Sequence, residues 1–181
     1  MNKNTKKIAL SAILSAAGVI LLMFGSIIEV LDLSAAAFAG FIIVIAVIEI
    51  RGKYPVLIYF AVSLISILIL PNKLPAIFFI MFAGIYPIFK ARFERFHPAV
   101  AWVLKFSMFN VILWLLIFFI RLLTSRELIN LREDIDFLNN FEIIVFLVAN
   151  FTFLLYDIAM TKVINIYLVK IRRLLKLENY F

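Results

Sequence analysis

A carboxylate, two amides, a guanidinium and an indole lie within two long apolar segments of the chain. They are Asp157, Asn110, Asn150, Arg121 and Trp114. Together these side chains offer both signs of charge, hydrogen-bond donors and acceptors, and an apolar wall, which is the chemistry of a site for a polar small molecule. Asp157 lies inside the apolar stretch FLLYDIAMTKV, residues 153–163. A carboxylate in such surroundings requires polar partners or a proton.

The chain that must position these residues is far more apolar than a soluble domain. Of its 181 residues, 66% are hydrophobic and 16% are charged, and its mean hydropathy is +1.12. A soluble domain has about half of its residues apolar and about a quarter charged. Apolar stretches of about 20 residues, long enough to cross a bilayer as a helix, recur along the chain. We therefore predict a single integral membrane domain over residues 1–181.

Six apolar segments predict an all-α bundle of six membrane-spanning helices, because a helix satisfies its own backbone hydrogen bonds in lipid. The segments are residues 8–28, 33–50, 54–70, 75–89, 99–123 and 141–168. The fourth is short and contains Pro87, which predicts a kink or a tilt. Residues 124–139 place apolar residues at helical spacing between charges, which predicts an amphipathic helix on the outer membrane surface. This helix would be either a linker resting on lipid or a lid.

Basic residues cluster on one side of the predicted spans. The clusters lie at residues 3–7, 51–53, 90–95 and 170–176, whereas most acidic residues lie in the connections on the other side. Lysine and arginine accumulate on the cytoplasmic side of membrane proteins. We therefore predict a multi-pass protein of the plasma membrane with both termini in the cytoplasm. The net charge of +7 has the same origin, so we expect no nucleic-acid partner.

Helical geometry, at about 100° per residue, indicates which faces carry the polar residues. Asn150 lies about 20° from Asp157, while Trp114 and Arg121 lie about 40° and about 20° from Asn110. Asn110 and Asp157 each lie about 11 residues from the cytoplasmic end of their span, close to the middle of the bilayer. We therefore expect Asn110 and Asp157 to face each other. They would form the floor of a pocket that opens to the outside.

The same polar residues have a second interpretation that involves no ligand. Amide and carboxylate side chains can bind membrane helices to one another, at about 0.6–1.7 kcal/mol per hydrogen bond. Glu49 is expected to form a structural pair with one of the lysines Lys53, Lys105 and Lys162. A further polar face on the third segment would either line the cavity or pack between helices. It consists of Tyr59, Ser63 and Ser66.

The sequence lacks the residue sets that most catalytic and metal sites require. It has no cysteine and a single histidine, His97. Zinc sites are built mainly from cysteine and histidine, and serine or cysteine nucleophiles are activated by histidine. A glycine-rich phosphate-binding motif is also absent from the sequence. We therefore predict that the protein is not an enzyme and uses no metal and no cofactor.

Small residues of the first segment form two faces, since residues three and four apart share a helix face. One face carries Ala9, Ala12 and Ala16, and the nearly opposite one carries Ser11, Ser15 and Gly18. Small residues four positions apart allow helices to approach closely in lipid. One face is expected to pack inside the bundle. The other would contact a partner protein or would also pack internally.

Six spans in under 200 residues, basic termini and the first-span sequence ALSAILSAAG resemble the S components of energy-coupling factor transporters. S components are the substrate-binding membrane subunits, and an Ala-x-x-x-Ala pattern in their first span docks a transmembrane coupling subunit. Ala12 and Ala16 match this pattern. The resemblance implies substrate binding from outside and uptake driven by two ATPase subunits. The sequence LPNKLPAIFFIMFAGIYPIFKARFE also resembles small membrane proteins of Gram-positive bacteria.

Two functions are consistent with these features. In the first, the protein captures a polar, vitamin-like small molecule through the five residues named at the outset and passes it to an ATP-driven module docked on the alanine face. In the second, the protein is a non-transporting interaction or assembly protein, and its intramembrane polar residues only pack helices. A co-purifying small molecule, or a neighbouring gene for an ATPase, would distinguish the two.

Overall fold

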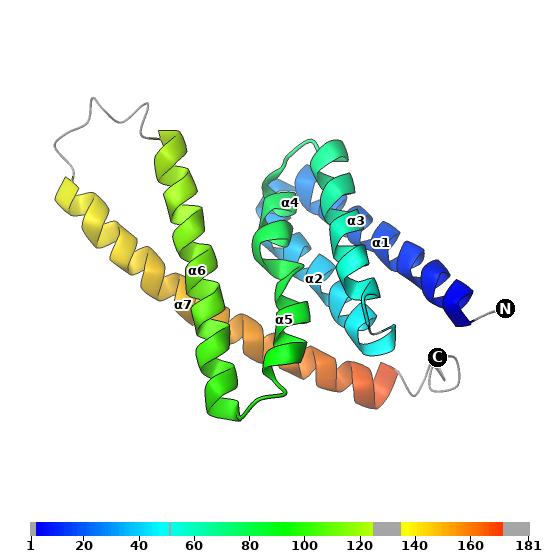
Figure 1. Cartoon of the computed structure of the whole chain (residues 1–181). Coiled ribbons are helices and arrows are strands. Elements are labelled where there is room, and N and C mark those ends of the chain that lie inside the picture. The colour runs from blue at the N-terminus through cyan, green and yellow to red at the C-terminus, as the bar shows by residue number, and fades with distance from the viewer. Residues whose placement is uncertain (1–2, 51, 125–134, 172–181) are drawn as a thin grey trace. The chain divides into compact units, whose positions relative to one another are not determined.

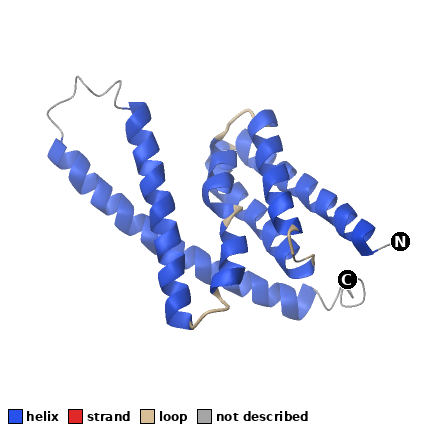
Figure 2. Ribbon diagram, in the orientation of Figure 1, coloured by secondary structure: helices blue, strands red, loops and turns tan. Residues whose placement is uncertain are grey.

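The computed structural model describes residues 3–50, 52–124 and 135–171, and this part of the chain consists of helices and connecting turns, with no strand (Figure 1, Figure 2). The prediction of an all-α fold is therefore confirmed. Within the described residues, five helices are long and apolar enough to cross a membrane. They are Asn4–Ile27, Asp32–Glu49, Leu74–Phe93, Pro98–Phe118 and Ile144–Lys170. The third predicted span corresponds to a shorter apolar helix, Tyr54–Ile69.

The helices follow the predicted segments closely. Their bounds are α1 Lys3–Ile27, η1 Glu29–Leu31, α2 Asp32–Glu49, α3 Tyr54–Ile69, α4 Leu74–Phe78, η2 Phe79–Ala83, α5 Tyr86–Phe93, α6 Pro98–Thr124, α7 Ile135–Ile166 and η4 Tyr167–Ile171. They form two compact units. The first comprises Met1–His97 with Ile164–Phe181, and the second comprises Pro98–Val163.

Close packing of small residues organises the first unit. A Cβ atom added to Gly18 of α1 would lie 3.0 Å from Cγ2 of Val62 in α3, and one added to Gly25 would overlap the methyl group of Ala35 in α2. Glycine and alanine thus bring three helices close together, as small residues do in lipid. An aliphatic and aromatic core fills the space between the helices of this unit. Its fully buried members include Leu22, Ile43, Val62 and Phe79.

The fourth predicted span is irregular, as expected, but the irregularity precedes Pro87. Residues 79–83 form a π-helical turn, in which the Gly84 N–H donates to the carbonyl of Phe79 at 2.7 Å. In a regular α-helix that N–H would bond to Ile80, whose carbonyl instead accepts a hydrogen bond from the Tyr59 hydroxyl at 2.8 Å. Pro87 has no N–H to donate to the preceding turn, so it cannot restore the α-helical pattern there.

The second unit is a hairpin of two long helices, α6 and α7 (Figure 1). Few of its side chains are buried, and aromatic contacts join the helices. Phe109 of α6 stacks on Phe153 of α7 with ring centroids 4.4 Å apart, and Phe106 meets the same ring edge-on at 5.3 Å. The amphipathic helix predicted over 124–139 lies largely outside the described residues. α7 begins at Ile135, near the end of that range.

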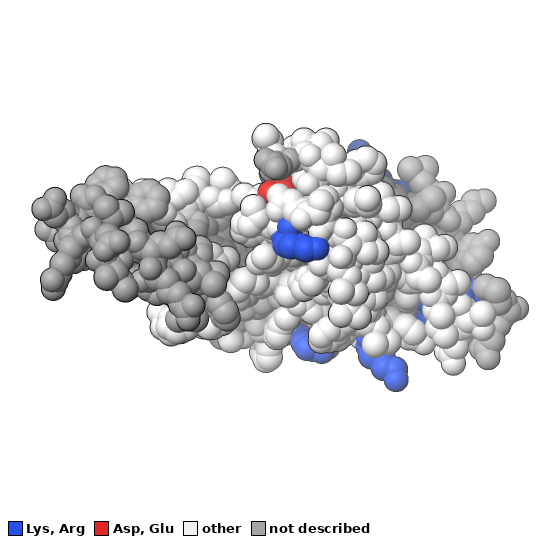
Figure 3. Space-filling view, turned by 90° about the horizontal axis from the view of Figure 1, so that it is seen from above, with Lys and Arg blue, Asp and Glu red and all other residues white. Residues whose placement is uncertain are grey.

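The surface of the described residues suits a hydrocarbon environment. Large aliphatic side chains are exposed along the helices, for example those of Leu64, Leu68 and Val103. The space-filling view shows a broad uncharged surface with few charged side chains (Figure 3). Long apolar helices that expose aliphatic side chains are the features of a multi-pass membrane protein.

Candidate functional site

Asp157 is held by a lysine. Its Oδ2 atom accepts a hydrogen bond from Nζ of Lys105 at 3.1 Å, and the two residues are 2% and 5% exposed. Nζ also lies 5.1 Å from the centroid of the Trp102 ring, within the range of a cation–π contact. Lys105 was expected only as a partner for Glu49, so its pair with Asp157 was not predicted. The sequence did contain a signal for this pair. The fifth predicted span carries a basic residue, Lys105, and the sixth carries an acidic residue, Asp157, both within apolar surroundings.

Asn110 and Asn150 form a reciprocal amide pair. Nδ2 of Asn110 donates to Oδ1 of Asn150 at 3.1 Å, and Nδ2 of Asn150 donates to Oδ1 of Asn110 at 3.0 Å. The second N–H of each amide donates to a backbone carbonyl one turn earlier, that of Phe106 or Phe146, at 2.9 Å. One N–H of each amide therefore joins α6 to α7, and the other is bonded within its own helix, so all four are satisfied.

The expectation that Asn110 faces Asp157 is wrong. Asn110 contacts Asn150, which lies seven residues before Asp157 in α7, and Asp157 contacts Lys105. Seven residues correspond to two helical turns, or about 10 Å along the axis. The expectation assumed that the cytoplasmic ends of the two spans lie level with each other. The inference that Asn150 and Asp157 share one face of α7 was correct, since both contact α6.

The remaining predicted ligand residues do not join these pairs. The Trp114 side chain is 64% exposed and stacks on Phe118, with ring centroids 5.7 Å apart. The side chain of Arg121 lies outside the described residues. The structure therefore brings Asn110 and Asn150 into contact and gives Asp157 a cationic partner, while Trp114 faces away from the interior. The assignment of the five residues to a ligand site stays a prediction.

The two small-residue faces of α1 have different surroundings. Gly18 is buried against Val62, and the hydroxyls of Ser11 and Ser15 donate to backbone carbonyls of their own helix at 2.7 and 2.9 Å. The other face is exposed along its length. Its small residues are Ala9, Ala12 and Ala16, and the Ile13 side chain is exposed beside them, about 40° from Ala9. Gly18 confirms that small residues of this helix serve internal packing, and the alanine face remains available to a partner.

Two further polar groups of the first unit serve packing. Glu49 is buried and accepts a hydrogen bond from the Tyr167 hydroxyl at 3.3 Å, a contact that sequence reasoning missed because it considered only lysines. Tyr59, Ser63 and Ser66 share one buried face of α3, as predicted. The Tyr59 hydroxyl donates to Ile80, so this face supports the π-helical turn.

Similarity to known proteins does not assign a function to this chain. Comparisons with protein-family models, with curated proteins and with solved structures give no match. Within the described residues, no group of three or more histidine, aspartate or glutamate side chains is placed to hold a metal ion. The contacts of the two polar pairs and of α1 are therefore the features from which a function can be inferred.

Proposed function

We propose that this chain is a multi-pass membrane interaction subunit that docks a partner helix on the alanine face of α1. The observation that carries the proposal is the exposure of Ala9, Ala12 and Ala16 on a helix whose opposite side packs tightly through Gly18. The polar pairs of α6 and α7 then bind the hairpin together. In this function the protein needs no ligand.

The alanine face differs from other exposed faces of the same unit. The exposed face of α3 carries large side chains, those of Leu57, Leu64 and Leu68. Large aliphatic side chains interdigitate well with lipid tails, whereas a row of small residues allows a second helix backbone to approach closely. Van der Waals contact along such a row is a principal source of helix association in lipid. The first half of α1 thus carries a row of small residues, with Ile13 exposed beside it, and such a row suits a helix–helix interface.

The proposal includes six spans with both termini in the cytoplasm. The span that is added to the five longer helices is α3, the third along the chain. Its 16 residues cover about 24 Å at ~1.5 Å per residue, and the adjoining turns extend it. The chain has no cysteine, so single cysteines can be introduced without background. We expect Asn4→Cys to react with a membrane-impermeant maleimide only in inverted vesicles, and Lys73→Cys, at an exposed position between α3 and α4, only in intact cells. The opposite pattern, or reaction of both on one side, would contradict this topology.

Site-specific photo-crosslinking in cells tests the docking function directly. A photoreactive residue at Ala12 is expected to give a discrete protein adduct, whereas the same residue at Leu64 of α3 is expected to give only lipid adducts. Leu64 is a matched control because it is exposed on a helix of the same unit. Identical adducts from both positions, or none from Ala12, would show that the alanine face docks no protein.

The Lys105–Asp157 pair favours a second candidate function, substrate capture for an ATP-driven uptake transporter. A buried ion pair stabilises a protein little compared with apolar residues of the same volume, and ionisable residues inside a membrane commonly mark substrate pathways. A zwitterionic, vitamin-like molecule could exchange its own charges with those of Lys105 and Asp157. In this function the alanine face would dock the coupling subunit of the transporter, together with its ATPases.

One double variant separates the two functions. Lys105→Met/Asp157→Leu replaces the ion pair by apolar side chains of similar volume. Under both functions the variant keeps the photo-crosslinked partner of Ala12, so this crosslink serves as the control that the protein is intact, and the bound small molecule separates the functions. If the protein captures a substrate, mass spectrometry of the purified protein finds a small molecule with the wild type and none with the variant. A wild type that carries no small molecule and has no ATPase partner excludes the uptake function.

A further inference from the structure

A cavity of about 490 Å³ lies within the first unit, where α2 ends, α3 begins and α5 ends. Its walls combine aliphatic side chains with two arginines. They include Val47, Ile48, Pro55, Ile88, Arg92 and Arg95. The volume lies in the range of small-molecule sites, about 300–1,000 Å³. Because these helix ends terminate apolar spans, the cavity lies at the level where the membrane meets water.

The local backbone explains why this region is hollow. Gly52 turns the chain between α2 and α3 with φ +68°, a conformation that favours glycine, and a Cβ atom added there would meet nothing within 4 Å. On the facing helix, Ala91 contributes only a methyl group between Ile88 and Arg92. A glycine turn and an alanine thus leave the space that larger side chains would fill.

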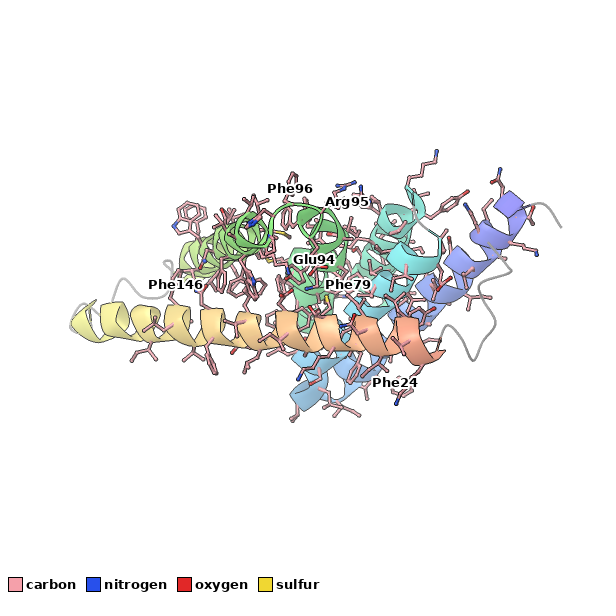
Figure 4. All side chains as sticks on the ribbon, turned by 90° about the horizontal axis from the view of Figure 1, so that it is seen from below. Phe24, Phe79, Glu94, Arg95, Phe96 and Phe146 are labelled. Carbon is pink, nitrogen blue, oxygen red and sulfur yellow. The ribbon has the colours of Figure 1, made fainter. Side chains whose placement is uncertain are left out.

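The positive charge of the cavity is not compensated by the described residues. Arg92 lies in the last turn of α5, and Arg95 lies in the turn that follows the helix, where its N–H donates to the Arg92 carbonyl at 3.2 Å. Both residues line the cavity. Both are exposed, and neither forms an ion pair with a carboxylate of the described residues. Glu94, labelled beside Arg95 in Figure 4, binds Lys90 at 2.7 Å instead. The carboxylate of Glu49 is buried and accepts a hydrogen bond from Tyr167.

The lining of the cavity, aliphatic side chains together with two arginines, indicates the class of ligand that it can bind. Two guanidinium groups that line one cavity bind a phosphate strongly, because each can donate two parallel hydrogen bonds. The aliphatic walls offer no hydrogen bonds to a sugar or a base, but they suit the glycerol and the first methylenes of acyl chains. A basic recess between membrane helices at the water boundary is suited to a lipid headgroup. We propose that this cavity binds the phosphate headgroup of an anionic phospholipid.

Native mass spectrometry of the full-length protein, released from nanodiscs, tests the proposal. The nanodiscs contain phosphatidylglycerol and phosphatidylcholine in equal amounts. The wild type is expected to retain phosphatidylglycerol, and Arg92→Gln/Arg95→Gln is expected to bind it at least about tenfold more weakly, because the charged hydrogen bonds to the phosphate are lost. The matched control is Lys6→Gln/Lys7→Gln, which removes the same charge from the same end of the first unit. An equal loss in this control would show general surface attraction and overturn the proposal.

Two further measurements keep the result decisive. Ala91→Leu fills the cavity without altering its charge, and it is expected to weaken phosphatidylglycerol retention; full retention would place the lipid elsewhere. Millimolar glycerol phosphate is expected not to displace the lipid, because it cannot use the aliphatic walls. Displacement by glycerol phosphate would show a site for a soluble phosphate compound and overturn the lipid assignment. Circular dichroism of each variant confirms that the helices are intact.

Discussion

The two units of this protein are stabilised in different ways. In the first unit, half of the residues in the apolar stretch of α2 are buried, and glycine and alanine hold α1, α2 and α3 in close contact. In the second unit, only 11% of the residues in the apolar stretch of α6 are buried, and two polar pairs and an aromatic stack join α6 to α7. A hairpin with little packed surface depends on directed bonds, since lipid provides no hydrophobic force between helices.

The difference shows what polar residues inside a membrane contribute. In the first unit, buried polar groups such as Tyr59 satisfy an irregular backbone that packing has already positioned. In the second unit they determine which residues of α6 and α7 face each other, because Lys105 must reach Asp157 and Asn110 must reach Asn150. Polar substitutions should therefore be more damaging in the hairpin, and volume changes more damaging in the first unit.

The largest expected effect is in the hairpin. Asp157→Ala removes the carboxylate that faces Lys105 and should lower the free energy of unfolding by about 3–5 kcal/mol, because a buried lysine loses its counter-ion. Reversible unfolding in mixed detergent micelles measures this change. Lys105→Met/Asp157→Leu should recover most of the loss. A double variant as unstable as Asp157→Ala would show that the loss of the counter-ion is not its cause.

Overpacking should have the next largest effect, in the first unit. A methyl group on Gly84 would lie 2.6 Å from Cζ of Phe79 and 2.8 Å from the Tyr59 ring, so Gly84→Ala should destabilise by about 1–3 kcal/mol. The same unfolding measurement applies. Phe79→Leu opens space at this position, so Gly84→Ala should cost less in that background. Strictly additive effects of the two substitutions would contradict the close packing.

The amide pair should contribute less than the ion pair. Asn110→Leu and Asn150→Leu should each destabilise by about 0.6–1.7 kcal/mol, the range measured for hydrogen bonds between membrane helices. The double variant should be no less stable than either single variant, because each single substitution already breaks the reciprocal pair. If the two losses simply add, the amides act independently and the pair does not hold the hairpin.

The smallest effect on unfolding is expected on the alanine face. Ala12→Leu/Ala16→Leu should change the free energy of unfolding by less than about 0.5 kcal/mol, because both side chains are exposed. Partner capture, measured as the crosslink from Ala9, should nevertheless be lost. A large loss of stability would show that this face packs within the protein, which is the alternative to docking.

The helical fold could be predicted because hydropathy and length alone define apolar helices. The irregular fourth span was also foreseen from Pro87, but its π-helical turn was not, since the hydrogen bond from Tyr59 to Ile80 joins residues of two different helices. Periodicity likewise identified the shared face of Asn150 and Asp157. Contacts between two helices, such as the one from Tyr59 to Ile80, leave no periodic signal in a single sequence.

The candidate site was harder to predict because it depends on how far one helix is displaced along another. Helical angles placed Asn110 and Asp157 on facing sides, but their relative depth was inferred from the ends of the spans. Lys105 lies one turn before Phe109, whose ring stacks on Phe153 of α7, so its backbone position faces α7. Angles counted from Asn110 alone did not reveal this. Exposure, as at Trp114, likewise depends on neighbours that a periodic pattern does not reveal.

The π-helical turn at residues 79–83 determines the direction in which the arginines that follow it point. Such a turn is equivalent to a one-residue insertion into an α-helix, and each residue advances the helix by about 100°. Deleting one residue from 79–83 would therefore rotate the following helix by more than a quarter turn. Arg92 and Arg95 would then point away from the glycine turn at Gly52. The insertion thus sets the phase at which the guanidinium groups enter the cavity.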